Sequence, residues 1–279
     1  GQRGGQLPQA MAYGVSVSTT DGVICVGGMN ERGALSVTYR IRVADKKAIV
    51  ETLPSLSCTL DNMTGALLGN KLYVAGGNKN GKASNAFYCL DLEQLPQGWR
   101  ELPAFPGAPR VQPVSAAQLD ADGQLCFYLW SGFAAPVEGR AASLSVDGYV
   151  YSPAADTWTP LPEVVNEAGE TVSLGGGVAT AWGKNLIICM GGVDKDIFLR
   201  ALQKPAADYL THPVEWYRFN KRILVYDVRL QEWQTIACTP DTARAGAALV
   251  ICGKNIFCIN GELKPGVRTP GITRIAIKE

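Results

Sequence analysis

One pattern recurs five times along this chain of 279 residues. Each copy holds a strand of small residues, a short turn, a strongly apolar strand that ends in or near Gly-Gly, and a third strand. Three copies continue into a fourth strand that begins with Trp. The clearest copy has Gly76-Gly77 after its apolar strand and Trp99 at the start of its last strand. The copies cover residues 9–54, 65–103, 115–162, 176–236 and 245–279.

The residue types in each copy predict short antiparallel strands. Runs of Leu, Ile, Val, Tyr and Cys lie between Asn, Asp and Gly residues, as in strands joined by tight hairpins. Gly69-Asn70 and Asp122-Gly123 are such turns. Four short strands repeated at intervals of roughly 50 residues are typical of propeller blades, and the Gly-Gly pairs indicate the kelch type. The prediction is an all-β, kelch-like β-propeller, one domain over residues 1–279 with five blades visible. A β-sandwich does not explain why Gly-Gly and Trp return in the same register.

The fifth copy stops before its outer strand. Residues 5–8 resemble the end of a Trp-x-x-Leu-Pro strand. This segment either completes the fifth blade or is the tail of a sixth blade, and the sequence leaves both open.

One connection breaks the rhythm of the repeat. Residues 193–222 form a long insertion, and their composition predicts a helix over residues 198–209. Long ordered loops commonly carry function, so we expect this insertion to form a lid or wall.

Charge and composition exclude several classes of protein. Twenty-six Lys and Arg balance 25 Asp and Glu, which argues against a nucleic-acid partner. No apolar run reaches the roughly 20 residues of a membrane span. Residues 1–8 contain no apolar stretch, so no secretory signal is expected in this chain.

The sequence contains few residues that could bind a metal or a cofactor. His212 is the single histidine, and it has no evident triad partner. The eight cysteines include no Cys-x-x-Cys pair, so neither a metal nor a cofactor is expected. The cysteines in apolar strands are expected to be buried free thiols, although an even number would permit disulfides. These are Cys25, Cys89, Cys126, Cys189 and Cys258.

Propeller topology gathers the segments after each Gly-Gly, and those before each inner strand, at one mouth of the channel. In the fifth copy, Pro265-Gly266 stiffens a short loop whose opposite arms carry Glu262 and Arg268. A carboxylate there can act as general base or acid, and an arginine can hold a ligand carboxylate. The alternative is an ordinary salt bridge within the loop.

Further polar residues fall on the same mouth. Arg110 either binds an anion or ties down its loop, Arg244 either faces the mouth or is solvated, and Tyr13 either lines the pocket or packs against the strand. Asp194 and Asn220 lie at the two ends of the insertion. All five are candidate substrate-binding residues.

These motifs resemble those of the N-acetylneuraminate epimerases, the sialic acid mutarotases. The resemblance rests on residues 259–269, 105–110, 191–198, 219–221 and 12–16. It implies a six-bladed kelch propeller that interconverts the α and β anomers of N-acetylneuraminate. It also implies a small acidic sugar as partner, Glu262 as proton acceptor and Arg268 as its essential partner. Relatives are periplasmic, whereas no secretory signal is expected in this chain, so its compartment is undecided. Its oligomeric state is undecided as well.

The order and two residues depart from the family pattern. The Ala-Tyr-Gly-Val-Ser segment stands at the start here, as in a cyclically permuted branch, whereas it lies near the C-terminus of the bacterial enzymes. Val178 replaces a histidine and Met11 an arginine. A kelch propeller that binds a glycan or protein without chemistry is therefore the alternative function. Copper chemistry of the galactose-oxidase kind is excluded by the single histidine.

Overall fold

The computed structural model of the protein describes residues 5–277, so the parts of the predicted domain at 1–4 and 278–279 lie outside the described residues. The fold is mostly β, and antiparallel sheets dominate it. Contacts between Cα atoms divide the chain into two compact units, Gly1–Val111 and Gln112–Glu279.

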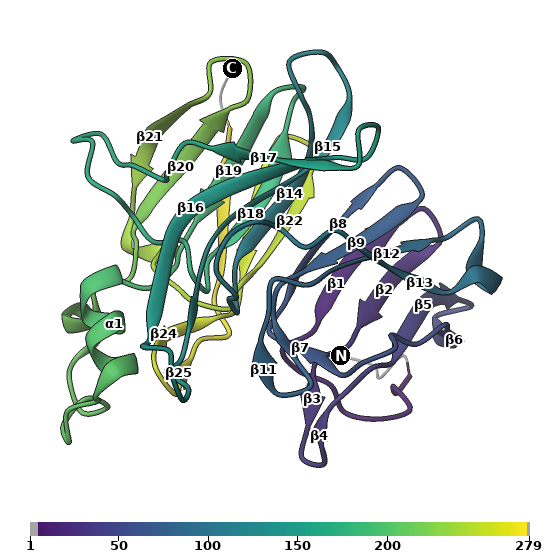
Figure 1. The fold of residues 1–279 in the computed structure, drawn as a ribbon, viewed down its shortest axis with the longest axis horizontal. Coiled ribbons are helices and arrows are strands. Elements are labelled where there is room, and N and C mark those ends of the chain that lie inside the picture. Colours follow the sequence, from purple (N-terminus) through teal and green to yellow (C-terminus); the bar gives the residue numbers. More distant parts are fainter. Residues whose placement is uncertain (1–4, 278–279) are drawn as a thin grey trace. The chain divides into compact units, whose positions relative to one another are not determined.

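Unit 1 contains two four-stranded antiparallel sheets (Figure 1). The first comprises β1 (Val15–Thr19), β2 (Gly22–Val26), β5 (Thr38–Ala44) and β6 (Lys47–Leu53). The second comprises β8 (Thr64–Leu68), β9 (Lys71–Ala75), β12 (Phe87–Asp91) and β13 (Trp99–Leu102), with the short helix η1 (Leu95–Gln97) before its last strand. Small ribbons form from β3 (Met29–Asn30) with β4 (Gly33–Ala34), and from β7 (Leu60–Asp61), β10 (Asn78–Lys79) and β11 (Lys82–Ala83).

Unit 2 contains three larger sheets. The third sheet comprises β14 (Val114–Leu119), β15 (Leu125–Ala134), β16 (Ser143–Ser152) and β17 (Thr157–Leu161). The fourth comprises β18 (Val178–Trp182), β19 (Leu186–Met190), β20 (Arg222–Asp227) and β21 (Glu232–Cys238). The fifth has β22 (Ala248–Cys252), β23 (Asn255–Ile259) and β26 (Ile272–Ala276), and among the described residues it has no fourth strand. Unit 2 also contains a hairpin of β24 (Glu262–Lys264) and β25 (Val267–Arg268). Its helices are α1 (Lys195–Gln203), η2 (Val214–Tyr217) and η3 (Pro240–Thr242).

The predicted four-stranded antiparallel sheets are thus confirmed. Each of the five sheets, the three-stranded fifth included, begins with a residue of left-handed backbone conformation two positions before its first strand. These residues are Tyr13, Asn62, Gln112, Gly176 and Gly246, with φ between 50° and 74°. Consecutive members are hydrogen-bonded within each unit: Asn62 N–H to the Tyr13 carbonyl, Gly176 N–H to Gln112, and Gly246 N–H to Gly176. Successive sheets of one unit are therefore joined at the same point of their repeat.

The Gly-Gly pairs allow the backbone of one repeat to contact the next. The N–H groups of Gly28, Gly77 and Gly192 donate to the carbonyls of Leu60, Arg110 and Arg244, at 2.8, 2.8 and 2.9 Å. At Gly27 and Gly191, the first members of two of these pairs, an added Cβ would lie 2.3 Å from the carbonyl oxygens of Leu60 and Arg244, respectively. Only glycine fits such an approach.

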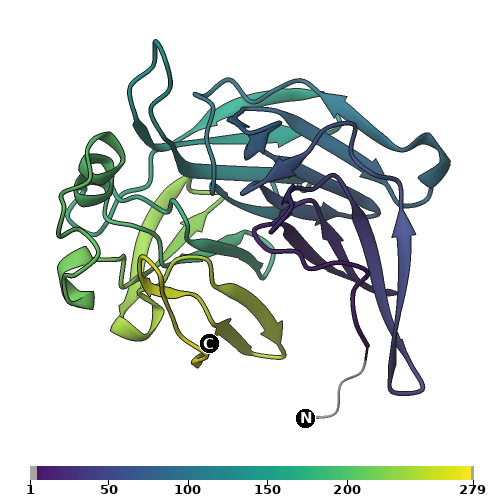
Figure 2. The same cartoon turned by 90° about the horizontal axis from the view of Figure 1, so that it is seen from below.

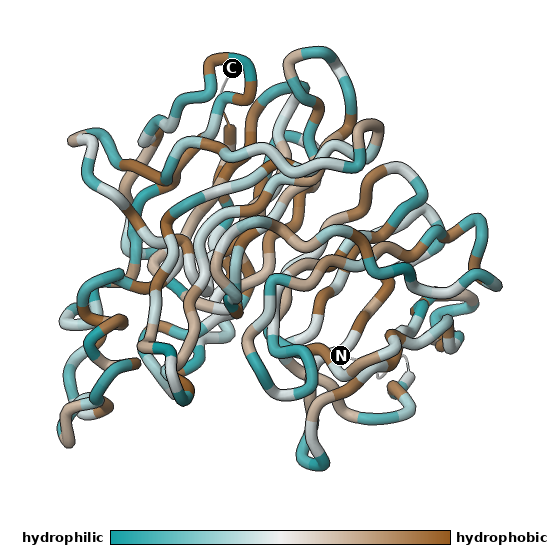
Figure 3. The backbone as a smooth tube through the Cα atoms, in the orientation of Figure 1, coloured by the Kyte–Doolittle hydropathy of each residue, from teal (hydrophilic) through white to brown (hydrophobic). Residues whose placement is uncertain are grey.

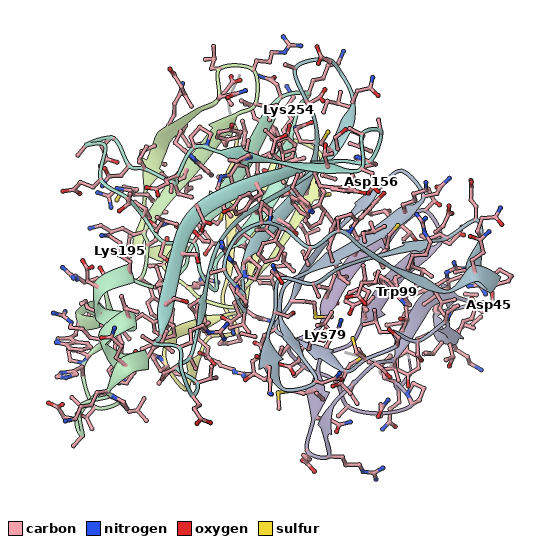
Figure 4. The ribbon with its side chains drawn as sticks, in the orientation of Figure 1. Asp45, Lys79, Trp99, Asp156, Lys195 and Lys254 are labelled. Carbon is pink, nitrogen blue, oxygen red and sulfur yellow. The ribbon has the colours of Figure 1, made fainter. Side chains whose placement is uncertain are left out.

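The apolar strands pack sheet against sheet within each unit. In Figure 3 the strands carry most of the hydrophobic residues, whereas the turns are hydrophilic. One cluster, with Leu72 and Val74, joins the first two sheets, and others join the third sheet to the fourth and the fourth to the fifth. Trp99, labelled in Figure 4, donates its Nε1–H to the Pro54 carbonyl at 3.0 Å, so its strand is tied to the preceding repeat.

The helix of the insertion starts and ends earlier than the predicted 198–209. Helix α1 begins at Lys195 because the Asp194 side chain accepts the N–H groups of Asp196 and Ile197, which is an N-cap. It ends at Gln203, and Pro205 follows two residues later, where a helix cannot continue. Figure 2 shows α1 beside the sheets of unit 2. Ring contact of Phe198 with Phe133, at 4.7 Å between centroids, fixes the helix to β15.

Other predictions concern the thiols, the N-terminal segment and the membrane. All eight cysteines are free, and Cys89, Cys126, Cys189 and Cys258 are buried as predicted, whereas Cys25 is half-buried. Gly5 lies against Ala48 of β6, in the first sheet, so this part of the 5–8 segment lies beside a strand of unit 1. Among the described residues, the helices are too short and too polar for a transmembrane span.

Candidate active site

Glu262 and Arg268 face each other across the short hairpin of β24 and β25. They are register partners, and Arg268 Nε lies 3.3 Å from Glu262 Oε1. Gly266, with φ of 77°, forms the turn between the arms. The Glu262 side chain is 30% exposed and that of Arg268 is 64% exposed. The two groups predicted to act together are therefore paired, and both are accessible to a solute.

Arg244 holds the base of this hairpin. Its guanidinium donates to the carbonyls of Asn260 and Gly271 at 3.0 and 2.8 Å, and to the Thr273 hydroxyl at 2.7 Å. The residue is only 6% exposed. The side chain is buried and bound to the protein, so it is not solvated, and substrate binding by Arg244 stays a prediction. The contacts give it the task of positioning the hairpin.

Backbone hydrogen bonds connect the hairpin to the ends of the insertion. Glu262 and Ala245 exchange two of them, at 2.7 and 2.9 Å. The carbonyl of the preceding residue, Arg244, accepts from Gly192 N–H, and the Gly192 carbonyl accepts from Asn220 N–H, both at 2.9 Å. Unit 2 thus brings Glu262, Arg244 and Asn220 into one continuous network.

The side chains at the ends of the insertion already have structural partners. Asn220 is buried, and its amide donates to the Gly191 carbonyl at 3.1 Å and to that of Arg222 at 3.3 Å. Asp194 caps α1 and also pairs with Arg218 at 3.3 Å. These contacts order the insertion, and a role in substrate binding remains a prediction for both.

Tyr13 and Arg110 belong to unit 1. Arg110 is 1% exposed, donates from Nε to the Ala108 carbonyl at 2.9 Å and lies over the Phe105 ring. This contact is the loop-fixing alternative that the sequence raised. Tyr13 is exposed and has a left-handed backbone, and its carbonyl accepts from Asn62 N–H. Anion or substrate binding by either residue stays a prediction.

His212 lies in the insertion, stacked on Trp216 with ring centroids 3.9 Å apart. Its Nε2 is 3.5 Å from a carboxylate oxygen of Asp208. Residues 5–277 contain no group of three or more His, Cys, Asp or Glu side chains arranged to hold a metal ion.

Lys264, which shares β24 with Glu262, is not among the residues that the sequence predicted for the site. Its amino group is bound to two carbonyls of the insertion, Leu210 and His212. Sequence offers one signal for it, a basic residue next to the Pro-Gly turn that carries the candidate pair.

Comparison with known proteins supplies the family. A family model described as N-acetylneuraminate epimerase matches residues 53–279. This chain belongs to the N-acetylneuraminate epimerase family. An N-acetylneuraminate epimerase of Haemophilus influenzae (strain PittEE) is 34% identical over 231 residues, and one of Salmonella paratyphi B is 29% identical over 236 residues. Both alignments cover 80% of this chain and 58% of the relative.

The solved structure of YjhT resembles the fold of this epimerase-family chain, with a TM-score of 0.66 and 29% sequence identity. The match covers 80% of this chain and 65% of that one. This chain thus spans little more than half the length of these curated family members. Residues 1–52, which contain most of the first sheet, lie outside the family match.

Proposed function

We propose that this chain interconverts the α and β anomers of N-acetylneuraminate by acid–base ring opening and reclosure. The observation that carries the proposal is the Glu262–Arg268 pair, held on one hairpin in a chain of the epimerase family. A carboxylate and a guanidinium, both partly exposed, suit a reaction on an acidic sugar. The pairing alone is also what an ordinary loop salt bridge would give, so the test must measure chemistry.

Each residue has a defined task in this proposal. The Glu262 carboxylate accepts the proton of the anomeric hydroxyl while solvent water supplies a proton to the ring oxygen, and the ring C–O bond opens. Rotation about one C–C bond presents the other face of the carbonyl, and the ring recloses. Arg268 binds the sugar carboxylate through parallel N–H···O bonds, which keeps the open form in place. Neither a redox step nor a group transfer occurs.

We infer that the sheets are blades of a kelch-type propeller, six-bladed in the family, of which this chain supplies five. Two features support this inference: the hydrogen-bonded residues of left-handed backbone conformation before each first strand, and the hydrogen bonds of the Gly-Gly pairs. Both repeat from sheet to sheet within a unit. The first sheet has both features, although most of it lies outside the family match. That agreement supports a cyclic permutation, in which the Ala-Tyr-Gly repeat has moved to the start of the chain.

Replacing Glu262 with Gln is the direct test of the activity. The amide keeps the shape of the side chain but cannot accept the proton, so anomer exchange should slow by roughly 10²- to 10⁴-fold. Proton NMR of freshly released α-N-acetylneuraminate measures the exchange rate against the spontaneous reaction. Glu232→Gln, at an exposed site on β21, is the matched control and should leave the rate unchanged.

Arg268→Ala separates the two tasks in the same assay. It should weaken the interaction with N-acetylneuraminate more than with its neutral methyl ester. If the wild-type chain equilibrates the anomers no faster than buffer does, the enzyme proposal is wrong. Binding of the sugar without acceleration would then identify a non-catalytic glycan-binding propeller.

A further inference from the structure

Lys264 links the hairpin of Glu262 and Arg268 to the insertion. Its Nζ donates to the carbonyls of Leu210 and His212, at 3.2 and 2.6 Å. It also lies over the ring of Tyr217, 5.7 Å from the centroid. An ammonium group has three donors, so two carbonyls and an aromatic face form a well-matched set of partners.

The partner segment of the insertion is itself firmly built. Tyr217 is 1% exposed, and its hydroxyl donates to the Tyr209 carbonyl. Its ring packs edge-on against Tyr209 and Trp216, and His212 stacks on Trp216. The amino group of Lys264 therefore meets an ordered surface of unit 2.

Arg244 fixes the other end of the hairpin. It binds the carbonyls of Asn260 and Gly271, where the chain leaves and re-enters the fifth sheet. Between this anchor and Lys264 lies Glu262, whose carboxylate depends on the backbone of β24 for its place. Without Lys264, the hairpin would be held mainly at its base.

We propose that Lys264 is a positioning residue for Glu262, which joins the catalytic hairpin to the insertion so that the two behave as one body. This inference rests on the proposed function, because it assigns Lys264 a task in the same reaction. Lys264 does not touch the reacting atoms and acts through the location of Glu262. Since a displacement of about 1 Å can slow a reaction roughly 100-fold, such an anchor has a large effect on rate.

Lys264→Met tests the proposal, because methionine keeps the length and apolar stem but removes all three donors. In the anomer-exchange assay, kcat should fall by roughly 10- to 100-fold while KM changes less than threefold. Lys264→Arg keeps the donors and should recover most of the lost kcat. Lys204→Met, at an exposed position after α1, is the control on the insertion and should match the wild type.

A second measurement does not depend on activity. Amide hydrogen exchange in Lys264→Met should accelerate in both residues 261–269 and residues 209–217, and Lys264→Arg should restore protection in both. Glu262→Gln should leave protection unchanged. Wild-type protection in both segments of Lys264→Met, or loss in one segment alone, would overturn the coupling.

If the wild type lacks activity but the exchange pattern is as expected, the proposed function fails and the coupling stands. An equal fall of kcat in Lys264→Met and Lys264→Arg would overturn the positioning role.

Discussion

Arg244 and Arg268 show that the surroundings of a guanidinium decide its task. Arg244 is buried, and its N–H groups are bound to carbonyls at the base of the hairpin. Arg268 is largely exposed and paired with Glu262. A buried guanidinium must be hydrogen-bonded within the protein, whereas an exposed one can exchange its partner for a ligand. The same residue type therefore serves as an anchor at 244 and as a candidate ligand clamp at 268.

Glu167 is the carboxylate for which the structure predicts a clear pH effect. Arg222 donates from Nε and Nη2 at 2.9 to 3.2 Å, and the Thr235 hydroxyl donates at 2.7 Å. The Arg222 hydrogen bonds, with that of Thr235, lower the pKa of Glu167 from 4.5 to about 2. Because the folded state holds the ionised form, this group stabilises the fold above pH 4.5. That contribution is lost as the pH falls from 4.5 towards 2.

Glu167→Gln should therefore unfold at lower urea concentration than the wild type at pH 7, with the gap narrowing below pH 4.5. Urea midpoints at pH 7, 4.5 and 3 measure the gap, and subtraction cancels the other carboxylates. In an Arg222→Met background, Glu167→Gln should shift the urea midpoint by nearly the same amount at each pH. A gap as wide at pH 3 as at pH 7 would contradict this assignment.

At the scale of elements, the glycine pairs are the joints between neighbouring repeats. Gly191 has φ of 71°, and a Cβ there would lie 2.3 Å from the Arg244 carbonyl oxygen. Gly192 donates its N–H to the same carbonyl. This joint leads directly to the hairpin of Glu262, so its geometry bears on the site as well as on stability.

Gly191→Ala should destabilise the protein by roughly 3 kcal/mol, because strain from the positive φ is added to a backbone clash. Gly253→Ala is the matched control. It also has a positive φ, 58°, but nothing lies within 4 Å of its added Cβ, so about 1 kcal/mol is expected. Urea unfolding of both variants measures the difference, and equal losses would show that the close approach does not matter.

The sequence predicted the strands better than the tasks of their polar residues. Apolar runs between Gly, Asn and Asp turns locate strands because local conformation and burial agree there. Helix α1 was misplaced because composition alone did not reveal that Asp194 is the N-cap that starts the helix at Lys195. The structural contacts of Arg244 and Asn220 could not be predicted, because repeat spacing places a residue near the mouth but does not say whether its side chain is buried. The pairing of Glu262 with Arg268 was predictable, since only five residues, which include a Pro-Gly turn, separate them.

At the scale of the whole molecule, each unit has hydrophobic clusters of its own. Unit 1 has a cluster around Leu72, Val74 and Leu90, all with no exposed surface. Unit 2 has clusters on both sides of the fourth sheet, and Leu224 of β20 is fully buried in one of them. Each unit thus possesses the apolar packing that holds its own sheets together.

Leu72→Ala tests whether the cluster of unit 1 stabilises the two sheets that it joins. Removing a fully buried leucine side chain should destabilise the protein by about 2–5 kcal/mol, from lost burial and the cavity that remains. Leu125→Ala is the control in a strand, because Leu125 is 38% exposed, and it should have a much smaller effect. Site-resolved amide exchange should show faster opening of β9 and β12 in Leu72→Ala, since both strands border the cavity. Unchanged protection of β12 would mean that the cluster of unit 1 does not hold its sheets, and that their stability comes from the backbone joints at Gly28 and Gly77 instead.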